Sequence, residues 1–270
     1  MAVKLRVLFL LVILSASLLA QSSTDAAQLN GQINGLAGIE MTFRNPPPNI
    51  AKIVLTPIET GAVADRRKFV RYSLGVTGLP QDKPYILMMW DIGSTSPRIF
   101  INEVRIDAKG ILHCGDQKDS CQGNLPGSQV EIGLGGMLGQ PRRFVLTGSD
   151  KKPVALGEAV PFPAIGTDKQ CSTEAVLLLP NGAATLILGK GFGHGEAVRF
   201  SSSSPYGEEL ESSSSADQDG NISRVVLPFV KGRDEGKTSV TFSGSNCRTS
   251  TTFNWGVYRE EQAQTAPAAK

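Results

Sequence analysis

Short apolar runs that alternate with polar or small residues dominate this chain. In Phe69–Val76, the residues Val70, Tyr72, Leu74 and Val76 alternate with Arg71, Ser73 and Gly75. A period of two residues predicts a strand with one buried face. The same style recurs between residues 166 and 257, where we expect strands at Glu174–Leu179, Ala183–Leu188, Glu196–Ser201, Glu208–Ser213, Asn221–Leu227, Lys237–Ser243 and Thr249–Trp255.

Turn residues separate these strands at regular intervals. Asn181-Gly182 and Asp219-Gly220 are typical of hairpin turns, and Pro205-Tyr206-Gly207 is a further turn. The polar segment Glu208–Ser213 that follows is expected to be an edge strand. Many short strands with frequent turns indicate an immunoglobulin-like sandwich.

The N-terminal half gives a similar but less regular pattern. Expected strands there are Ile39–Phe43, Lys52–Leu55, Phe69–Val76, Tyr85–Trp90, Ile99–Ile106, Val130–Leu134 and Arg143–Leu146. The proline-rich segment Val160–Pro163 is interpreted as a linker. The predicted fold is therefore all-β, with two immunoglobulin-like β-sandwich domains in tandem, at residues 21–160 and 166–257. Residues 21–30 and the polar tail 258–270 are expected to be disordered.

Residues 1–20 have the pattern of a secretory signal peptide. Lys4 and Arg6 precede an apolar run from Val7 to Leu14, and small residues lead to Ala20. The run is short for a bilayer core of roughly 30 Å, so cleavage is favoured over a retained anchor, which stays the alternative. We expect a secreted or periplasmic protein with no stable membrane insertion after cleavage.

Charge argues against a nucleic-acid partner. Removing Lys4 and Arg6 from the 27 Lys and Arg leaves 25, which equals the 25 Asp and Glu. Nucleic-acid binders usually carry a basic excess on one face. The clusters Arg66-Arg67-Lys68 and Arg142-Arg143 are interpreted as solvated strand ends or turns.

The chain has four cysteines, which in an exported protein suggest two disulfides. Four cysteines allow three connectivities, and we favour Cys114–Cys121 with Cys171–Cys247. Cys171 precedes the first strand of the C-terminal half and Cys247 precedes the last. If those two strands lie side by side and parallel, their starting ends meet, which would make this bridge unlike the antibody disulfide that joins two sheets. No C-x-x-C spacing supports a metal site.

A resemblance supports the sandwich prediction. The stretch Leu188–Val198, which reads LGKGFGHGEAV, is similar to the G-x-G-F-x-x-G-E-x-V segment of bacterial extracellular immunoglobulin-like domains of the IPT/TIG kind. The segment Asp217–Asn221 resembles the acidic turn that often follows in those domains. The resemblance covers the C-terminal half and implies a secreted, usually non-enzymatic module without a common functional site.

Candidate chemistry has simpler structural interpretations. Gly189–Gly195 lacks the Lys-Ser/Thr pair and the helix of a phosphate loop, and Ser149–Lys152 has the S-x-x-K spacing without a following helical pattern. Asp217, Asp219 and Asn221 have the alternate spacing of a calcium loop, but Pro228 stands where the closing glutamate would be. A β-turn is favoured there, with weak calcium binding as the alternative.

Catalysis would have to use one of the two histidines, His113 and His194, and both are interpreted as turn or structural residues. We therefore expect no enzyme activity, no catalytic residues and no cofactor. The predicted function is a non-enzymatic binding or structural module with an unknown protein or surface-glycan partner. The alternative is a carbohydrate- or ligand-binding accessory module, for which Tyr206, Trp255 and Tyr258 could form a stacking surface, although Trp255 alternates with Phe253 as a core residue would. A hydrolase that uses His113 or His194 is the third class.

Overall fold

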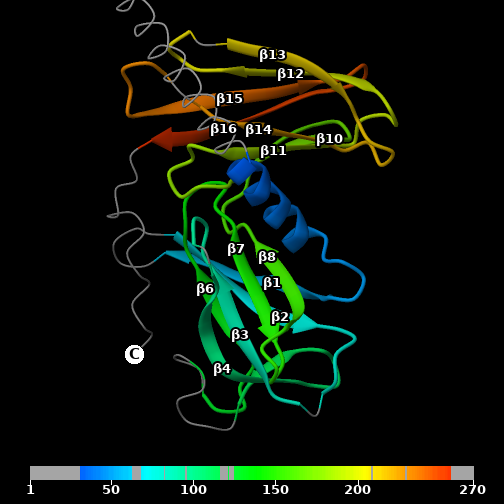
Figure 1. The fold of residues 1–270 in the computed structure, drawn as a ribbon, viewed down its shortest axis with the longest axis vertical. Helices are drawn as coiled ribbons and strands as arrows, with labels where there is room; N and C mark the ends of the chain where they lie inside the picture. Colours follow the sequence, from blue (N-terminus) through cyan, green and yellow to red (C-terminus); the bar gives the residue numbers. More distant parts are fainter. Residues whose placement is uncertain are drawn as a thin grey trace, which may run out of the picture. The chain divides into compact units, whose positions relative to one another are not determined.

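The computed structural model describes residues 31–62, 68–81, 83–94, 96–115, 121, 125–207, 209–228 and 230–256. The expected leader at 1–20 and the segments 21–30 and 258–270, which are expected to be disordered, lie outside these residues. Sixteen strands and one helix make up the described chain, so the prediction of an all-β protein is confirmed. Figure 1 shows the strands as arrows in layers of sheet.

The helix spans residues 31–44, so the strand expected at Ile39–Phe43 is wrong. Ile33, Glu40 and Phe43 are its buried positions, and spacings of seven and three residues place them on one helical face. A five-residue window was too short to reveal this period. The helix ends just before Asn45, which precedes Pro46, because the residue before a proline disfavours helical backbone.

Eight strands surround the first core. Their order in the sheet is β5-β4-β3-β7-β8-β1-β2-β6, and β1 joins its two parts, pairing antiparallel with β2 and parallel with β8. The strands are β1 (Ala51–Ala62), β2 (Lys68–Val76), β3 (Tyr85–Trp90), β4 (Arg98–Ile106), β5 (Leu112–Cys114), β6 (Glu131–Leu134), β7 (Arg142–Thr147) and β8 (Pro153–Ala159).

The two ends of this sheet come together. Cys114 N donates to Ser128 O at 2.8 Å and Val130 N donates to Leu112 O at 2.8 Å, so β5 pairs with the segment that leads into β6. The sheet thereby encloses a core of fully buried residues that includes Ile53, Leu74, Leu87, Ile101, Leu112, Phe144 and Leu146. The predicted alternation of β2 is confirmed, because Val70, Tyr72, Leu74 and Val76 are all buried.

Two four-stranded sheets form the sandwich around the second core. One has the order β14-β11-β10-β9 and the other β13-β12-β15-β16. Phe200, Phe242 and Phe253 lie between them and are almost fully buried. The strands are β9 (Ala164–Asp168), β10 (Cys171–Leu177), β11 (Thr185–Lys190), β12 (Ala197–Ser203), β13 (Glu209–Ser215), β14 (Ile222–Val226), β15 (Glu235–Ser243) and β16 (Arg248–Gly256).

The turns of the sandwich follow the prediction with one exception. Asn181-Gly182 lies in the connection between the antiparallel pair β10 and β11, and Pro205-Tyr206-Gly207 joins β12 to β13, which is an edge strand as expected. Asp219-Gly220 does not close a hairpin, because β13 and β14 belong to different sheets. The connection crosses from one sheet to the other, which a local turn signal cannot reveal.

Strands β5, β8 and β9 are not among the strands expected from the sequence. Much of β8 is buried, so its sequence lacks alternation, and β9 is only five residues long. Strands β8 and β9 flank the segment that was interpreted as a linker. Phe162 in that segment packs against the first core, whereas Ala164 belongs to the second.

Both expected disulfides are present, Cys114–Cys121 and Cys171–Cys247, with Cα atoms 5.8 and 6.2 Å apart. Cys171 begins β10 and Cys247 directly precedes β16, so the starts of these strands meet as expected. The two strands nevertheless lie in different sheets. The bridge therefore joins the two sheets, and the expectation that it differs from the antibody type in this respect is wrong.

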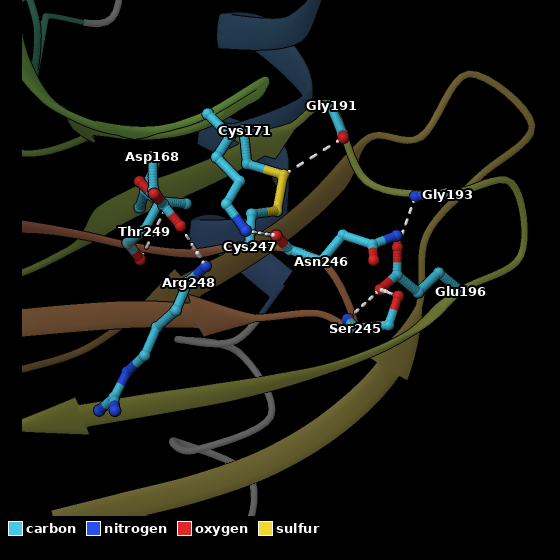
Figure 2. The surroundings of a disulfide bond; sticks show 12 residues. Asp168, Cys171, Gly191, Gly193, Glu196, Ser245, Asn246, Cys247, Arg248 and Thr249 are labelled. Carbon is cyan, nitrogen blue, oxygen red and sulfur yellow. Dashed lines mark hydrogen bonds between the residues drawn. A yellow bond between two sulfur atoms is a disulfide. The ribbon is translucent and has the colours of Figure 1, made fainter.

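Polar contacts hold the chain around the second disulfide (Figure 2). Arg248 N donates to Asp168 Oδ2 at 2.9 Å, and Lys169 Nζ donates to Asn246 O at 2.7 Å. Glu196 reaches the same loop, where its carboxylate accepts from the N–H and the hydroxyl of Ser245. The Ser245 N–H, followed by that of Gly193, lowers the pKa of Glu196, so the carboxylate is held ionised as a tie between two loops.

Candidate functional site

A polar cleft of about 890 Å³ lies where the end of the helix and strands β1 and β8 approach the sandwich. Arg44 of the helix, Lys52 of β1 and Glu158 of β8 line one side of the cleft. From the sandwich come residues of β11, β13, β14 and the connection between β13 and β14. Its sandwich-side polar lining consists of Lys190, Ser214, Ser215, Asp217, Asp219, Asn221, Ser223 and Arg224.

A network of two arginines and three glutamates lies next to this cleft. Arg44 donates from Nη1 and Nη2 to the two carboxylate oxygens of Glu174 at 2.9 and 2.8 Å, and from Nε to Glu40 at 2.9 Å. Arg143 donates to the second Glu40 oxygen from Nε at 3.0 Å and from Nη2 at 2.6 Å. The forked Arg44–Glu174 pair links the helix to β10 of the sandwich with fixed geometry.

The side chains of this network are withdrawn from water. Arg143 is 3% exposed, Glu40 0% and Glu158 5%. The interpretation of Arg142-Arg143 as a solvated strand end is therefore wrong for Arg143. Arg142 is also engaged, because it donates to Gly135 O and to Asp91. Of the other basic cluster, Arg66 and Arg67 lie outside the described residues, and Lys68 is exposed.

The two buried carboxyl groups of Glu40 and Glu158 titrate in opposite directions. Burial raises the pKa of Glu158 to about 9, and the nearby Glu40 charge adds to this rise. Burial would also raise the pKa of Glu40, but a hydrogen bond from Glu158 and the charges of Arg143 and Arg44 together lower it. At neutral pH Glu158 thus holds a proton and Glu40 is a carboxylate. Glu158 Oε2 is buried without a hydrogen-bond partner.

This assignment predicts a pH effect for Glu158→Gln. Between the ordinary pKa of 4.5 and the folded value, the native protein holds a proton that the unfolded chain has released. Rising pH therefore destabilises the wild type by up to about 1.4 kcal/mol per pH unit, and a neutral glutamine removes this slope. We expect urea unfolding to show Glu158→Gln gaining stability relative to the wild type from pH 5 to pH 8. The exposed Glu211→Gln should show no such gain, and an equal difference at both pH values would contradict the assignment.

Three cations line the cleft without an ion-pair partner among the described residues: Lys52, Lys190 and Arg224. Lys52 Nζ donates only to the Arg44 carbonyl oxygen, at 3.2 Å. Arg224 donates through Nη2 to Ser214 Oγ at 3.0 Å and to Ser213 O at 3.4 Å, while its Nε is buried without a partner. The cleft thus presents three cations that form no ion pair with any of the described acidic residues.

The expected calcium residues form a hydrogen-bonded turn. Asp217 Oδ1 accepts from Asp219 N at 2.9 Å and from Asn221 N at 2.8 Å. The Asn221 N–H is the largest cause of a lowered Asp217 pKa. The turn explains the spacing without a metal, and no cluster of three or more metal-ligating side chains occurs in the described part of the chain. Weak calcium binding stays an untested alternative.

The same turn occurs in the first half. Asp107 Oδ1 accepts from Lys109 N and Ile111 N, and Gly110 occupies the position of Gly220. Both glycines have positive φ, +80° and +72°. A Cβ at Gly220 would lie 2.1 Å from the Phe192 carbonyl oxygen, so only glycine fits. The D-x-x-G spacing that Asp107–Gly110 and Asp217–Gly220 share was the sequence signal that could have predicted the second turn.

The other sequence candidates form no common site: His113 lies on β5, and His194 lies in the turn after β11. His113 contacts Asp107 Oδ2 at 3.0 Å and Gly127 O at 3.2 Å, and His194 contacts Gln218 O at 3.3 Å. Ser149–Lys152 is the turn between β7 and β8. Trp255 is 7% exposed and belongs to the core, as its alternation indicated. Tyr206 is exposed under Arg233, and Tyr258 lies outside the described residues, so the described residues show no three-ring stacking surface.

Comparisons with known proteins give little further information. No family model matches the chain, and no curated protein matches it. Among solved structures, a tetra-tandem repeat from the extending region of a large adhesion protein aligns at 11% identity over 76% of this chain, with a TM-score of 0.24. This chain spans about half of that structure (48%).

Two further solved structures align comparably. The chicken interferon gamma receptor alpha chain aligns at 6% identity over 74% of this chain and 98% of its own, with a TM-score of 0.23. The BSP domain of a biofilm associated protein aligns at 9% identity over 84% of this chain and 55% of its own, with a TM-score of 0.18. Scores this low carry no argument about function. In the described residues, no helix has the length and apolar character needed to cross a membrane.

Proposed function

We propose that this chain is an exported, non-enzymatic binding module whose recognition surface is the polar cleft. The observation that carries this proposal is the combination, in one cleft, of three cations without an ion-pair partner among the described residues and several serine hydroxyl groups. The two disulfides support export, because such bonds persist in oxidising compartments. The leader pattern at residues 1–20 supports a secreted or periplasmic location.

The finer assignments are part of the same proposal. We propose that the C-terminal half, residues 166–257, is an immunoglobulin-like domain of the bacterial IPT/TIG kind, and that residues 21–160 form a separate domain. The support is the LGKGFGHGEAV segment, in which Gly191 begins the turn after β11 and Glu196 ties that turn to Ser245.

Binding is favoured over catalysis by where the reactive groups lie. His113 and His194 are not among the residues that line the cleft, and they contact Asp107, Gly127 O and Gln218 O and not a cleft serine. Glu40 is enclosed by Arg44 and Arg143 and is fully buried, so it faces no substrate. A cleft of this composition offers hydrogen bonds and charge to a ligand instead of a nucleophile with its base.

Blocking the cleft tests the proposal. Ser223 is exposed on β14 and lines the cleft, whereas Ser239 is exposed on β15 in the opposite sheet. We expect Ser223→Trp to abolish binding of the purified protein to an array of bacterial surface proteins and glycans, and Ser239→Trp to leave it unchanged. Near-UV circular dichroism verifies the fold of both variants. A wild type that binds nothing, or binding that survives Ser223→Trp, would overturn the proposal.

A carbohydrate-binding accessory module is the second candidate, and the serine hydroxyls of the cleft favour it. Ser214, Ser215 and Ser223 lie close to Asn221 in the lining. Hydroxyl, amide and carboxylate groups exchange hydrogen bonds readily with sugar hydroxyls. On the array described above, this candidate requires that the cleft-dependent signals come from the glycans and not from the proteins.

A further inference from the structure

The cations around the cleft are of two kinds: those paired with a glutamate of the protein, and those without an ion-pair partner among the described residues. The second kind is available to attract an anionic ligand. Arg44 is bound to Glu174 and Glu40, and Arg143 is bound to Glu40, so these arginines are neutralised inside the protein. Lys190, Lys52 and Arg224 have no such partners in the described chain. Fixed positive charge in a cleft with protein walls raises the local concentration of anions.

The opposing carboxylates offset these cations only in part. Asp217 accepts three hydrogen bonds from its own turn, which occupy both of its oxygens but leave its negative charge in place. Asp219 is exposed and has no ion-pair partner among the described residues. The lining has three acidic residues, of which Glu158 holds a proton at neutral pH, so the three cations face two ionised carboxylates. A carboxylate such as Asp219 also readily accepts hydrogen bonds from ligand hydroxyls.

The uncharged part of the lining selects among anions. Ser214, Ser215 and Ser223 provide hydroxyls on two adjacent segments of the sandwich. Phe43 is the one aromatic residue in the lining and is 2% exposed, so the cleft has no ring on which a base or an aromatic side chain could stack. A ligand that suits this surface is itself rich in hydroxyl groups and carries an acidic group.

We infer that the cleft binds an acidic saccharide, with Lys190 and Arg224 holding its carboxylate or sulfate and the serine hydroxyls holding its ring hydroxyls. Arg224 has a planar guanidinium of which only Nη2 is bonded, which leaves Nη1 for a carboxylate or sulfate oxygen. Lys52 approaches the same ligand from β1. The inference rests on the proposed binding function and names its ligand class.

Titration calorimetry on the purified, disulfide-bonded protein tests this inference. The two acidic probes are tetragalacturonate, which carries carboxylates, and a heparin-derived tetrasaccharide, which carries sulfates. Maltotetraose is the neutral control sugar. We expect at least one acidic probe to bind about tenfold or more tighter than maltotetraose, with affinity that falls as salt rises, because added ions screen the exposed lysines.

Charge-removing variants locate the site. Lys190→Gln and Arg224→Gln should each lower the affinity for the acidic probe about tenfold. Lys237 is an exposed lysine on β15, and Lys237→Gln should leave that affinity unchanged. Lys190 is exposed at the end of β11, so its replacement leaves the fold intact even if that of Arg224 does not. Unchanged affinity in Lys190→Gln, or acidic probes that bind no better than maltotetraose, would overturn the inference.

Two further probes separate saccharide recognition from simple charge. Sodium sulfate and tetraglutamate carry the anionic groups without sugar hydroxyls. If either binds as tightly as the acidic tetrasaccharides, the cleft recognises charge alone and the saccharide assignment is wrong. Such a result would leave the proposed binding function standing, provided that Ser223→Trp still abolishes array binding. Loss of all cleft-dependent binding would instead refute the proposed function itself.

Discussion

Arg143→Ala is expected to lower the free energy of unfolding by about 3–5 kcal/mol. Its guanidinium donates twice to Glu40, and both side chains are almost completely removed from water. Removing Arg143 leaves the fully buried Glu40 charge with Arg44 as its one remaining cationic partner among the described residues, and breaking a buried ion pair in this way is the costly case. The loss of the Arg143 stack on the Phe43 ring adds to the effect. Urea unfolding at pH 7, followed by circular dichroism, measures the change.

Arg98→Ala provides the matched control. Arg98 is 55% exposed and pairs with Asp91 at the surface, where an ion pair contributes about 0–1 kcal/mol. We therefore expect a change of about 1 kcal/mol or less for this variant. A loss for Arg143→Ala no greater than that of Arg98→Ala would show that the network does not depend on the buried pair.

Arg143 also shows where sequence analysis stops. In the sequence it follows Arg142 in a basic dipeptide, which is typical of a solvated strand end. Its burial depends on Glu40, which is 103 residues away and lies on a helix that the local pattern did not predict. The acidic proton of Glu158 likewise depends on surroundings that come from the helix and β7. Partners so distant in sequence leave no trace in a window of ten residues.

The sandwich strands were predictable for the opposite reason. In β15, Thr238, Val240 and Phe242 are buried and alternate with less buried residues. The local sequence of the strand is therefore enough to predict which of its faces is buried. β8 has a run of buried residues in place of alternation, so its sequence carries no period that predicts a strand. The cleft depends on both kinds of information. The local pattern predicted β11 and β14, but it could not predict that these strands lie near Arg44 and Lys52, which are distant in sequence.

Replacing both Cys171 and Cys247 with alanine is expected to cost about 4–5 kcal/mol. The two cysteines are 76 residues apart, and in the chain-entropy account a cross-link that closes a loop of this length strongly restricts the unfolded chain. The bridge also joins the two sheets of the sandwich at the start of β10 and β16. After its loss, polar contacts such as Lys169–Asn246, Arg248–Asp168 and Glu196–Ser245 still hold the chain near that point. Thermal and urea unfolding of the double variant measure the loss.

The first disulfide, Cys114–Cys121, provides a control for the effect of loop length on stability. Cys114 and Cys121 are only seven residues apart, so their double alanine variant should lose about 2–3 kcal/mol by the same reasoning. Because both cysteine pairs are buried, the replacements remove similar side-chain volume, and the difference reports the loop length and the joining of the sheets. If the Cys114–Cys121 variant proved the less stable of the two, the long loop would not be the main source of stabilisation. The sandwich would then be held by its Phe200, Phe242 and Phe253 core without needing the bridge.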